Sequence, residues 1–354
     1  MFVYVGSYTE PSFGSGEGIS VFEFDPESGE LTPVQTAAGV ANPSFLALDA
    51  GERHLYAVEE LDEGGVGAFA RDPATGRLTL LNRQASHGAA ACYVSLSHDG
   101  SYALVANYGS GTVAALPIAA DGRLEPATGV VQHEGSSVDP ERQAGPHAHM
   151  IAPTPDGRLV LATDLGTDRL LVYRLDDETG RLLPSDRGPG AVATTPGAGP
   201  RHLAFAPDGR TLYVINELAS TLTVSGYDGG RGEIDARQTL STLPEGFGGE
   251  STCAHVAVSP DGRFVYGSNR GHDSIAIWAV DRASGELTSL GHEPTRGRDP
   301  RNFAIDPTGA WLLAANQRSD TIVAFRRDSG SGMLAATGQV TRTASPVAIV
   351  FARD

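Results

Sequence analysis

Side chains able to bind anions and move protons recur at two places in a repeated pattern of this chain. One group opens apolar, strand-like runs: His147, His149, Arg201, His202, His255, Arg301 and Asn302. A second group closes the runs that follow: Glu59, Glu60, Asn107, Tyr108, Asp164, Asn216, Glu217, Asn269, Arg270, Asn316 and Gln317. Arginine binds carboxylate or phosphate oxygens through paired hydrogen bonds and neutralises a developing oxyanion, whereas His or Glu takes a proton near neutral pH. Brought together, such groups would suit acid–base chemistry on an anionic substrate, including lactone hydrolysis or its reverse.

The elements that must position these residues are visible as two interleaved repeats. The first has Asp, a few small or polar residues, Gly and an apolar residue, and its seven glycines are Gly29, Gly76, Gly122, Gly180, Gly232, Gly285 and Gly332. In such a hairpin turn, Asp bonds its own backbone and Gly takes positive φ. The second repeat is an apolar strand, a tight turn and another apolar strand, with six turn glycines at Gly51, Gly100, Gly157, Gly209, Gly262 and Gly309. Four strands in a period near 50 residues predict one blade of a β-propeller.

The missing copy of the second repeat is split between the two ends of the chain. Residues 345–352 resemble an inner strand without its partner, and residues 2–6 resemble a second strand without its predecessor. Pairing them completes a seventh blade and leaves no open sheet edge. The sequence therefore predicts an all-β, seven-bladed propeller with four antiparallel strands per blade, formed as a single domain by residues 1–354.

Strand directions predict which end of the propeller carries the chemistry. Both families of short turns fall on one face, so the starts of the inner strands and the ends of the second strands meet at the opposite mouth of the channel, where pockets tend to form. Taken one at a time, some of these residues could have a purely structural role. An Asn at the end of a strand can hydrogen-bond the backbone groups of a tight loop, and His202 or His255 can hydrogen-bond a neighbouring blade. Arg201 and Arg270 need a partner beside a narrow channel, either Glu217 or a bound anion.

Composition excludes several function classes. A net charge of −17 argues against nucleic acid as a partner, and the absence of Lys, with all 26 basic residues Arg, excludes a Schiff-base lysine, a pyridoxal-phosphate lysine and a P-loop. Cys92 and Cys253 are expected to be small buried residues. With no basic leader and no long apolar run, we expect a cytoplasmic protein without membrane contact. We find no GxSxG, HExxH, EF-hand or dinucleotide motif, and no spacing that supports a metal site, so no metal or cofactor is expected.

One segment carries a family resemblance. HEGSSVDPERQAGPHAHM (133–150) is similar to the signature segment of the propeller-type 6-phosphogluconolactonase family, which includes the carboxy-muconate lactonising enzymes. VGSYTE (5–10), NYGSGTV (107–113), GPRHLAFAPDGRTLYVINE (199–217) and SNRGHDS (268–274) extend the resemblance along the chain. It implies a seven-bladed propeller and metal-independent hydrolysis of 6-phospho-glucono-δ-lactone in the pentose phosphate pathway. By position, the family's functional residues fall on His147 or His149, Arg201, Glu217 and Arg270.

Three hypotheses follow. In the first, the protein is a lactonase in which Glu217 or a mouth histidine activates water while Arg201 and Arg270 hold the anionic substrate. The residues expected to bind the substrate in addition are Asn107, His202, His255, Asn269, Asn302 and Asn316. The second is a cycloisomerase or lactonase for a carboxylated, non-phosphorylated substrate such as carboxy-muconate. The third is a binding propeller without catalysis, which would expose an apolar patch on a face or rim.

Overall fold

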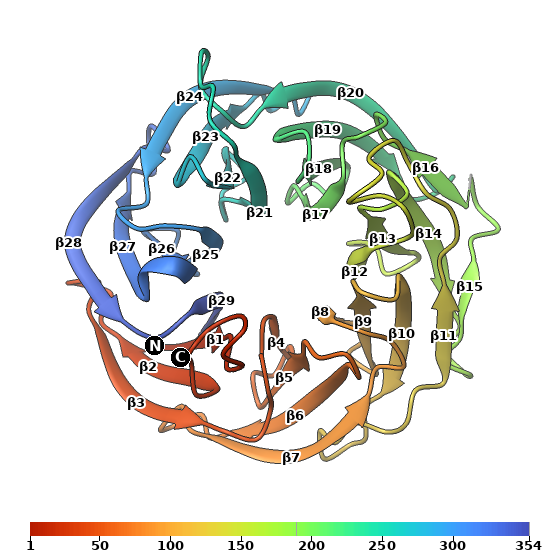
Figure 1. Cartoon of the computed structure of the whole chain (residues 1–354), viewed down its shortest axis with the longest axis horizontal. Coiled ribbons are helices and arrows are strands. Elements are labelled where there is room, and N and C mark those ends of the chain that lie inside the picture. Colours follow the sequence, from red (N-terminus) through yellow and green to blue (C-terminus); the bar gives the residue numbers. More distant parts are fainter. Residues whose placement is uncertain (189, 354) are drawn as a thin grey trace.

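The computed structural model describes residues 1–188 and 190–353 as seven antiparallel sheets arranged around a central channel (Figure 1). The described residues contain no α-helix and one short 3-10 helix, η1 (Gln317–Ser319). This architecture confirms the predicted seven-bladed propeller.

Each blade has four strand positions from the channel outward. The inner strands are β29 (Pro346–Ala352), β4 (Leu46–Leu48), β8 (Ala91–Leu96), β12 (Ala148–Pro153), β17 (Pro200–Phe205), β21 (Thr252–Val258) and β25 (Pro300–Ile305). The second strands are β1 (Phe2–Ser7), β5 (His54–Glu59), β9 (Tyr102–Asn107), β13 (Val160–Asp164), β18 (Thr211–Asn216), β22 (Phe264–Arg270) and β26 (Trp311–Asn316). The third strands are β2 (Ile19–Phe24), β6 (Gly65–Arg71), β10 (Thr112–Pro117), β14 (Arg169–Leu175), β19 (Thr221–Asp228), β23 (Ser274–Val280) and β27 (Thr321–Arg327). The outer strands are β3 (Leu31–Ala37), β7 (Leu78–Ala85), β11 (Gly129–Gln132), β15 (Leu182–Pro184) with β16 (Ala191–Ala193), β20 (Glu233–Ser241), β24 (Leu287–Pro294) and β28 (Leu334–Arg342).

The two ends of the chain close the ring. β29 pairs with β1 in antiparallel register from Phe2 opposite Ala352 to Val5 opposite Ile349, so one sheet has the order β29-β1-β2-β3. The predicted split blade is therefore confirmed. In-register closure removes the inner edge that β1 would otherwise leave unpaired.

Neighbouring blades are joined by apolar packing and by a repeated hydrogen bond. Tyr4 of β1 donates its hydroxyl to the carbonyl of Gly76, in the hairpin of the next blade, at 2.8 Å. Tyr56, Tyr213 and Tyr266 repeat this bond to Gly122, Gly285 and Gly332. Between blades, apolar faces form clusters such as the one that joins Trp311 and Leu313 to Val3 and Phe24. Each blade thus buries the apolar face of its neighbour, and the ring is rigid enough to fix residues at its centre.

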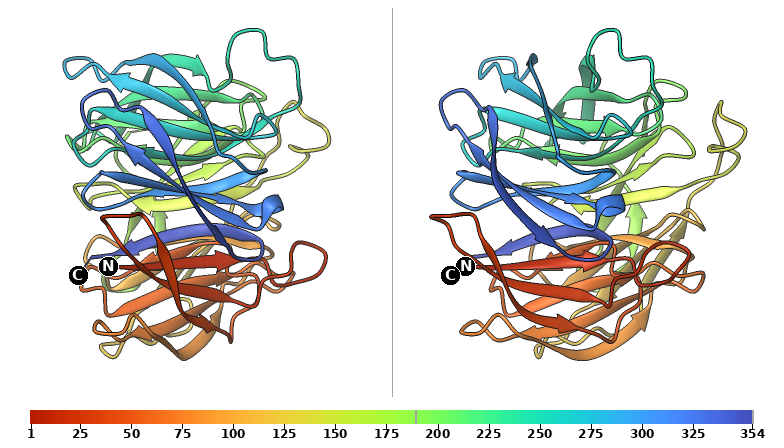
Figure 2. Two further views of the ribbon diagram at one scale, coloured as in Figure 1. Left: turned by 90° about the vertical axis from the view of Figure 1, so that its left-hand side faces the viewer. Right: turned by 60° about the vertical axis from the view of Figure 1, so that its left-hand side comes forward.

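The long connections and the short turns lie on opposite faces. In side view, extended loops project from one side of the ring, whereas both chain ends lie on the other side (Figure 2). Glycine supplies the turn conformation on the second face: Gly29 has φ +77°, and its amide bonds the Asp25 carbonyl at 2.8 Å. The face with the long connections is the one on which the sequence places the candidate site.

Candidate active site

A β-bulge at the start of the inner strand directs side chains into the channel mouth. In four blades the pairing of the inner with the second strand skips one residue, and the skipped residues are Cys92, His149, Arg201 and Arg301. A bulge leaves its extra residue unpaired and re-aims its side chain. All four of these side chains line the same pocket.

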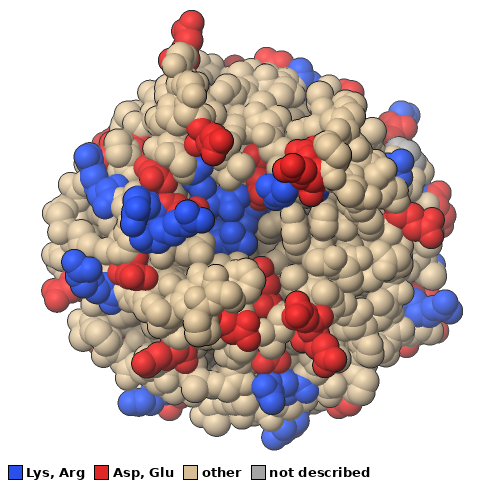
Figure 3. All heavy atoms as spheres, in the orientation of Figure 1, with Lys and Arg blue, Asp and Glu red and all other residues tan. Residues whose placement is uncertain are grey.

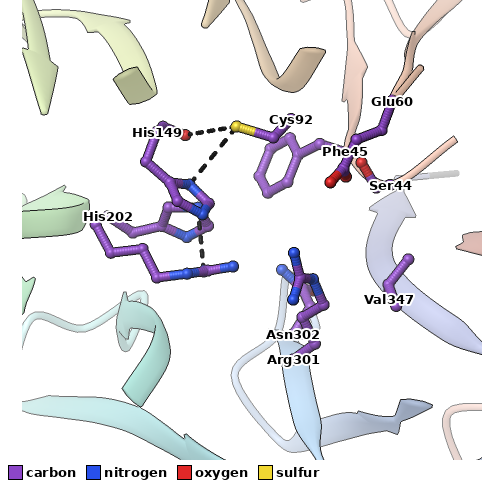
Figure 4. Close-up of a pocket in the computed structure, with 10 residues that line it drawn as sticks. Ser44, Phe45, Glu60, Cys92, His149, His202, Arg301, Asn302 and Val347 are labelled. Carbon is purple, nitrogen blue, oxygen red and sulfur yellow. Dashed lines mark hydrogen bonds between the residues drawn. The ribbon is translucent and has the colours of Figure 1, made fainter. Parts of the chain in front are cut away.

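This pocket lies where six of the seven blades meet. Its lining consists of Ser44, Phe45, Glu60, Cys92, His149, Arg201, His202, Arg301, Asn302 and Val347. Figure 4 shows His149 and His202 on one side and Arg301 and Asn302 on another. The enclosed volume is about 10 Å³, roughly the space that one water molecule needs. A larger ligand would therefore enter from the open mouth and project only one group inward.

Glu217 is held by three arginines beside this pocket. Its Oε2 accepts from Arg201 Nε at 2.8 Å and forms an ion pair with Arg270 at 2.9 Å, and its Oε1 accepts from Arg142 at 2.8 Å. The exposed fraction of the arginine side chains rises from 2% for Arg201 through 14% for Arg270 to 40% for Arg142. The carboxylate is thus the shared anchor of an arginine cluster that extends from the buried channel to the rim.

The charges of this cluster decide what Glu217 can do. Burial alone would raise the pKa of the Glu217 carboxyl, but the Arg270 and Arg201 charges outweigh burial and hold that pKa far below its usual range. Burial and the Arg270 charge lower the pKa of Arg201 to about 10, so its guanidinium stays protonated at neutral pH. A carboxylate so strongly stabilised is a poor proton acceptor. The structure therefore favours Glu217 as a positioning residue for arginines over Glu217 as the base.

Three histidines continue from the pocket along the channel, and all are neutral near pH 7. His149 and His202 are buried, whereas His255 is partly exposed. Burial and the Arg201 charge hold the pKa of His149 and His202 well below 6.5, and the same causes lower the pKa of His255 to about 3. The His202 ring packs edge-on against both others, with centroids 5.2 Å apart in each pair. A neutral imidazole has a lone pair that can accept a proton, but the lowered pKa makes each of these histidines a weaker base than an ordinary imidazole.

Hydrogen bonds determine the tautomers of two of these histidines. Arg201 can only donate, so its 3.4 Å contact with His202 Nε2 requires a lone pair on that nitrogen. The proton of neutral His202 is then on Nδ1, which lies 2.9 Å from His255 Nδ1 and donates to it. His202 is thereby committed to Arg201 and His255, and it is not available as the base.

The structure separates the two histidines of GPHAHM. His147 lies outside the pocket: its Nδ1 donates to the Tyr108 carbonyl at 2.8 Å, and its ring stacks on the Tyr108 ring. His149 lines the pocket, with Nδ1 3.8 Å from the Cys92 sulfur (Figure 4). No described residue hydrogen-bonds to His149 Nε2. Of the two candidates, His149 is the one placed to take a proton from a group in the pocket.

Arg301 is the arginine of the pocket that lacks a carboxylate partner. It forms no ion pair within residues 1–188 and 190–353, and its guanidinium lies 5.4 Å from the centre of the Tyr8 ring. Burial would lower the pKa of Arg301, but Tyr8, Glu60 and Glu217 raise it above its ordinary value. Arg301 is therefore a charged donor available to an anion in the pocket.

Three predicted substrate-binding residues are directed elsewhere. The amides of Asn107, Asn269 and Asn316 are buried and donate to the carbonyls of Ser86, Thr242 and Thr295, each in the connection that leads into the same blade. Asn107 also bonds Thr112 on the third strand at 3.0 Å. The side chains of these asparagines point into the blade and not into the channel. Their hydrogen bonds stabilise the ends of the second strands. These hydrogen bonds favour a structural role for the three asparagines over substrate binding.

Two further predictions need separate treatment. His255 does not line the mouth pocket, because His202 lies between His255 and that pocket. It lines the wide opening of the channel on the opposite face, together with residues such as Asp49 and Asp306. This position does not favour a contact of His255 with a substrate in the mouth pocket. Asn302 does line the pocket, while its Oδ1 accepts the Ile349 amide at 3.0 Å. The Asn302 NH₂ group remains a candidate contact for a ligand.

Comparison with known proteins identifies the family. A family model described as "Lactonase, 7-bladed beta-propeller" matches residues 2–351. The chain belongs to this lactonase family. It is 40% identical to the 6-phosphogluconolactonase of Bacillus subtilis (strain 168) over 301 residues, which covers 85% of this chain and 83% of the relative.

Solved structures agree with this membership. The chain resembles the periplasmic gluconolactonase of Pseudomonas aeruginosa, with a TM-score of 0.94 and 38% identity over 99% of both chains. It also resembles a protein from Lactobacillus plantarum, with a TM-score of 0.91 and 34% identity over 99% of both chains. Both similarities extend over the whole ring, including all strands that deliver the pocket residues.

Some site residues of this lactonase were not selected from its sequence. Arg142 lies in the connection between β11 and β12, away from any strand end, so the repeat gave no signal for it, although it stands inside the segment 133–150. Tyr8 follows β1 and bonds Glu60 at 2.9 Å from the neighbouring blade. Arg301 stands at the start of an inner strand, where the repeat predicts site residues, but the family resemblance assigns the second functional arginine to Arg270. Cys92 and Cys253 are buried, as expected.

Among the described residues, no helix has the length and apolar character that crossing a membrane would need. In the same part of the chain, no three His, Cys, Asp or Glu side chains gather in a way that could hold a metal ion.

Proposed function

We propose that this lactonase hydrolyses 6-phospho-glucono-δ-lactone to 6-phosphogluconate in the pocket at the channel mouth. The observation that carries the proposal is the pair His149 and Arg301. A neutral imidazole with an unbonded Nε2 and a guanidinium without a carboxylate partner line the same enclosed space. These are the two functions that ester hydrolysis needs, a proton acceptor and an oxyanion stabiliser.

The proposed reaction begins with water in the pocket. The water oxygen attacks the lactone carbonyl carbon while His149 Nε2 takes one of the water protons. The carbonyl oxygen becomes an oxyanion, and Arg301 stabilises it together with the remaining donors of Arg201. Collapse restores the C=O bond and breaks the bond to the ring oxygen, which takes the proton from His149. The product is an open-chain acid that loses its own proton to solvent.

Glu217 acts in this proposal through the arginines. By accepting hydrogen bonds from Arg201 and Arg142 and pairing with the Arg270 charge, it fixes three cations whose mutual repulsion would otherwise spread them apart. Removal of Glu217 should therefore reduce activity without removing the base.

The choice of substrate rests on the two relatives with named activities. One is named a 6-phosphogluconolactonase and the other a gluconolactonase, so both act on the lactone of a sugar acid by name. An arginine-rich mouth in a chain of net charge −17 supports the anionic, phosphorylated compound. A cytoplasmic location remains a prediction from the sequence, since one relative is periplasmic by name.

The test compares the decay of 6-phospho-glucono-δ-lactone with and without the purified protein. Because that lactone opens spontaneously, Arg301→Gln serves as the blank, and we expect it to lose about 10²-fold or more in kcat/KM. Exposed Arg77, in a hairpin on the opposite face, supplies the matched control Arg77→Gln, which should retain full activity.

Two outcomes would reject the proposal. The first is a wild-type protein that fails to accelerate decay above the spontaneous rate. The second is saturation by a muconate-type acid with indifference to the phosphorylated lactone, which would favour the carboxylated, non-phosphorylated substrate.

A further inference from the structure

A second cavity adjoins the arginine cluster on the same face. This groove has a volume of about 380 Å³ and is lined by Glu250, Ser251, Thr252, Arg270, Gly271, Asp273, Arg298, Asp299 and Arg318. Arg270 lines this groove and forms an ion pair at 2.9 Å with Glu217, which also binds Arg201 of the mouth pocket. Figure 3 shows arginine side chains gathered from the mouth outward over this part of the rim.

The three arginines of the groove differ in whether their charge is paired with a carboxylate. Arg318 pairs with Asp299 at 2.9 Å, and Arg270 pairs with Glu217. Arg298 is exposed and makes no ion pair with any described residue; its side chain donates to the Arg318 carbonyl at 3.2 Å. One cation of the groove is therefore uncompensated, and it is held beside a second.

The acidic residues of the groove are mostly occupied. Asp299 is bound to Arg318, and Asp273 Oδ1 accepts the amides of Asp299 at 2.8 Å and Gly271 at 3.2 Å. Only Glu250, which is exposed, lacks such a partner within the described chain. These bonds direct carboxylate oxygens toward the protein and leave arginine donors for a ligand.

A buried donor also lacks an acceptor here. Arg270 Nε is inaccessible to solvent and has no hydrogen-bond partner among the described residues. Buried N–H groups are nearly always bonded in folded proteins, so the Arg270 side chain, which lines this groove, would gain a hydrogen bond by turning Nε toward a ligand acceptor there.

We propose that this groove binds the phosphate monoester of the substrate, with Arg298 and Arg318 as its principal contacts and Arg270 at its inner end. The inference rests on the proposed function: the lactone carbonyl lies at the opening of the mouth pocket while the phosphate lies in the groove. Arginine forks bind phosphate oxygens through paired, charge-assisted hydrogen bonds. The groove would thus select phosphorylated over unphosphorylated sugar lactones.

The test is a ratio of specificities. We would measure kcat/KM for 6-phospho-glucono-δ-lactone and for glucono-δ-lactone in the wild type, in Arg298→Gln and in Arg298→Gln/Arg318→Gln. The ratio of the two kcat/KM values should fall about tenfold or more in the single variant and further in the double variant, mainly through KM for the phosphorylated lactone. Arg296→Gln is the matched control, because exposed Arg296 pairs with Glu293 outside the groove.

A binding measurement keeps this proposal separate from the proposed activity. Calorimetry should show weaker binding of 6-phosphogluconate to Arg298→Gln, with inorganic phosphate competing in the wild type, whatever the catalytic rate. A wild type without activity on either lactone would reject the proposed function, while the binding results would still judge the groove. An unchanged specificity ratio, or equal affinity of wild type and variants for 6-phosphogluconate, would overturn the phosphate site.

Discussion

Arg201 and Glu217 form a buried ion pair in which Arg201 Nε donates to Glu217 Oε2 at 2.8 Å. Their side chains are 2% and 7% exposed, and two further arginines bind the same carboxylate. Breaking a buried pair leaves an uncompensated charge, which typically costs 3–5 kcal/mol. The arrangement makes the site and the stability of the ring depend on one side chain.

Glu217→Gln should therefore lower both stability and activity. We expect the free energy of unfolding to fall by about 3 kcal/mol or more and kcat/KM to fall about 10²-fold, because Arg201 and Arg270 lose their shared anchor. Urea denaturation and steady-state kinetics measure the two effects. A Glu217→Gln protein of full stability that lost only its acid limb in the pH–rate profile would instead identify Glu217 as the base.

Substitution of the two GPHAHM histidines should distinguish base from neighbour. His149→Gln should lose about 10²-fold or more in kcat, as expected for a missing general base, whereas His147→Gln should lose far less. In the wild type the acid limb of kcat/KM should lie well below pH 6.5, because burial and Arg201 lower the pKa of His149. Larger loss in His147→Gln than in His149→Gln would contradict the assignment.

The tautomers of His202 and His255 can be observed directly. Nitrogen-15 NMR of the imidazoles should show His202 protonated on Nδ1 and His255 protonated on Nε2, as the contact of Arg201 with His202 requires. His255→Leu removes the acceptor of a buried N–H and should cost about 1–3 kcal/mol of stability, whereas His255→Gln, which retains an acceptor, should cost less. Protonation of His202 on Nε2 would refute the proposed bonding.

Stability should fall as the pH is lowered from 6.5. Burial holds the pKa of His149 and His202 well below 6.5 and that of His255 at about 3, while the unfolded chain keeps ordinary values, so protons bind preferentially to the unfolded state. Their stabilisation is complete above pH 6.5 and is lost toward the folded pKa values, at up to about 1.4 kcal/mol per pH unit for each histidine. Urea unfolding at pH 7.5 and 5.0 measures the difference. This difference in the free energy of unfolding should be smaller in His255→Gln but unchanged in the control His98→Gln, which lies on an exposed turn. A free energy of unfolding that does not change with pH would show that these imidazoles are not held neutral by the fold.

Asn316→Ala should affect stability and leave catalysis nearly intact. The amide of Asn316 donates to the Thr295 carbonyl at 3.1 Å inside the blade, and loss of such a buried bond costs about 1–3 kcal/mol. We expect kcat/KM to stay within about threefold once the folded fraction is corrected, whereas Asn302→Ala, at the pocket wall, should lower it. The reverse order would restore Asn316 to the substrate site.

The site could be located from the sequence but not assembled from it. The predicted ends of the strands indicate which residues lie near the channel mouth. On that basis His149, Arg201 and Glu217 are expected near one another, and the structure places them so. The direction in which each side chain points could not be predicted in this way. Asn107 ends one second strand and Glu217 follows another, yet the Asn107 side chain points into its blade and the Glu217 side chain points into the channel. Asn107 is the last residue of β9, whereas Glu217 comes one residue after the end of β18, and successive residues point to opposite sides of a strand. In the inner strands a one-residue bulge also shifts this alternation, and the repeat does not reveal where the pairing skips.

Repeat number, ring closure and the face that holds the long connections were determined by the sequence alone, because turn residues and strand alternation are local and recur in every blade. Which arginine is uncompensated, which histidine meets the pocket and which carboxylate is unable to accept a proton were decided by the tertiary structure. Those properties depend on burial and on charges brought together from different blades: Arg142, Arg201 and Arg270 reach Glu217 from three separate segments. Electrostatic interactions of this kind follow distance in space, and no spacing along the chain encodes them.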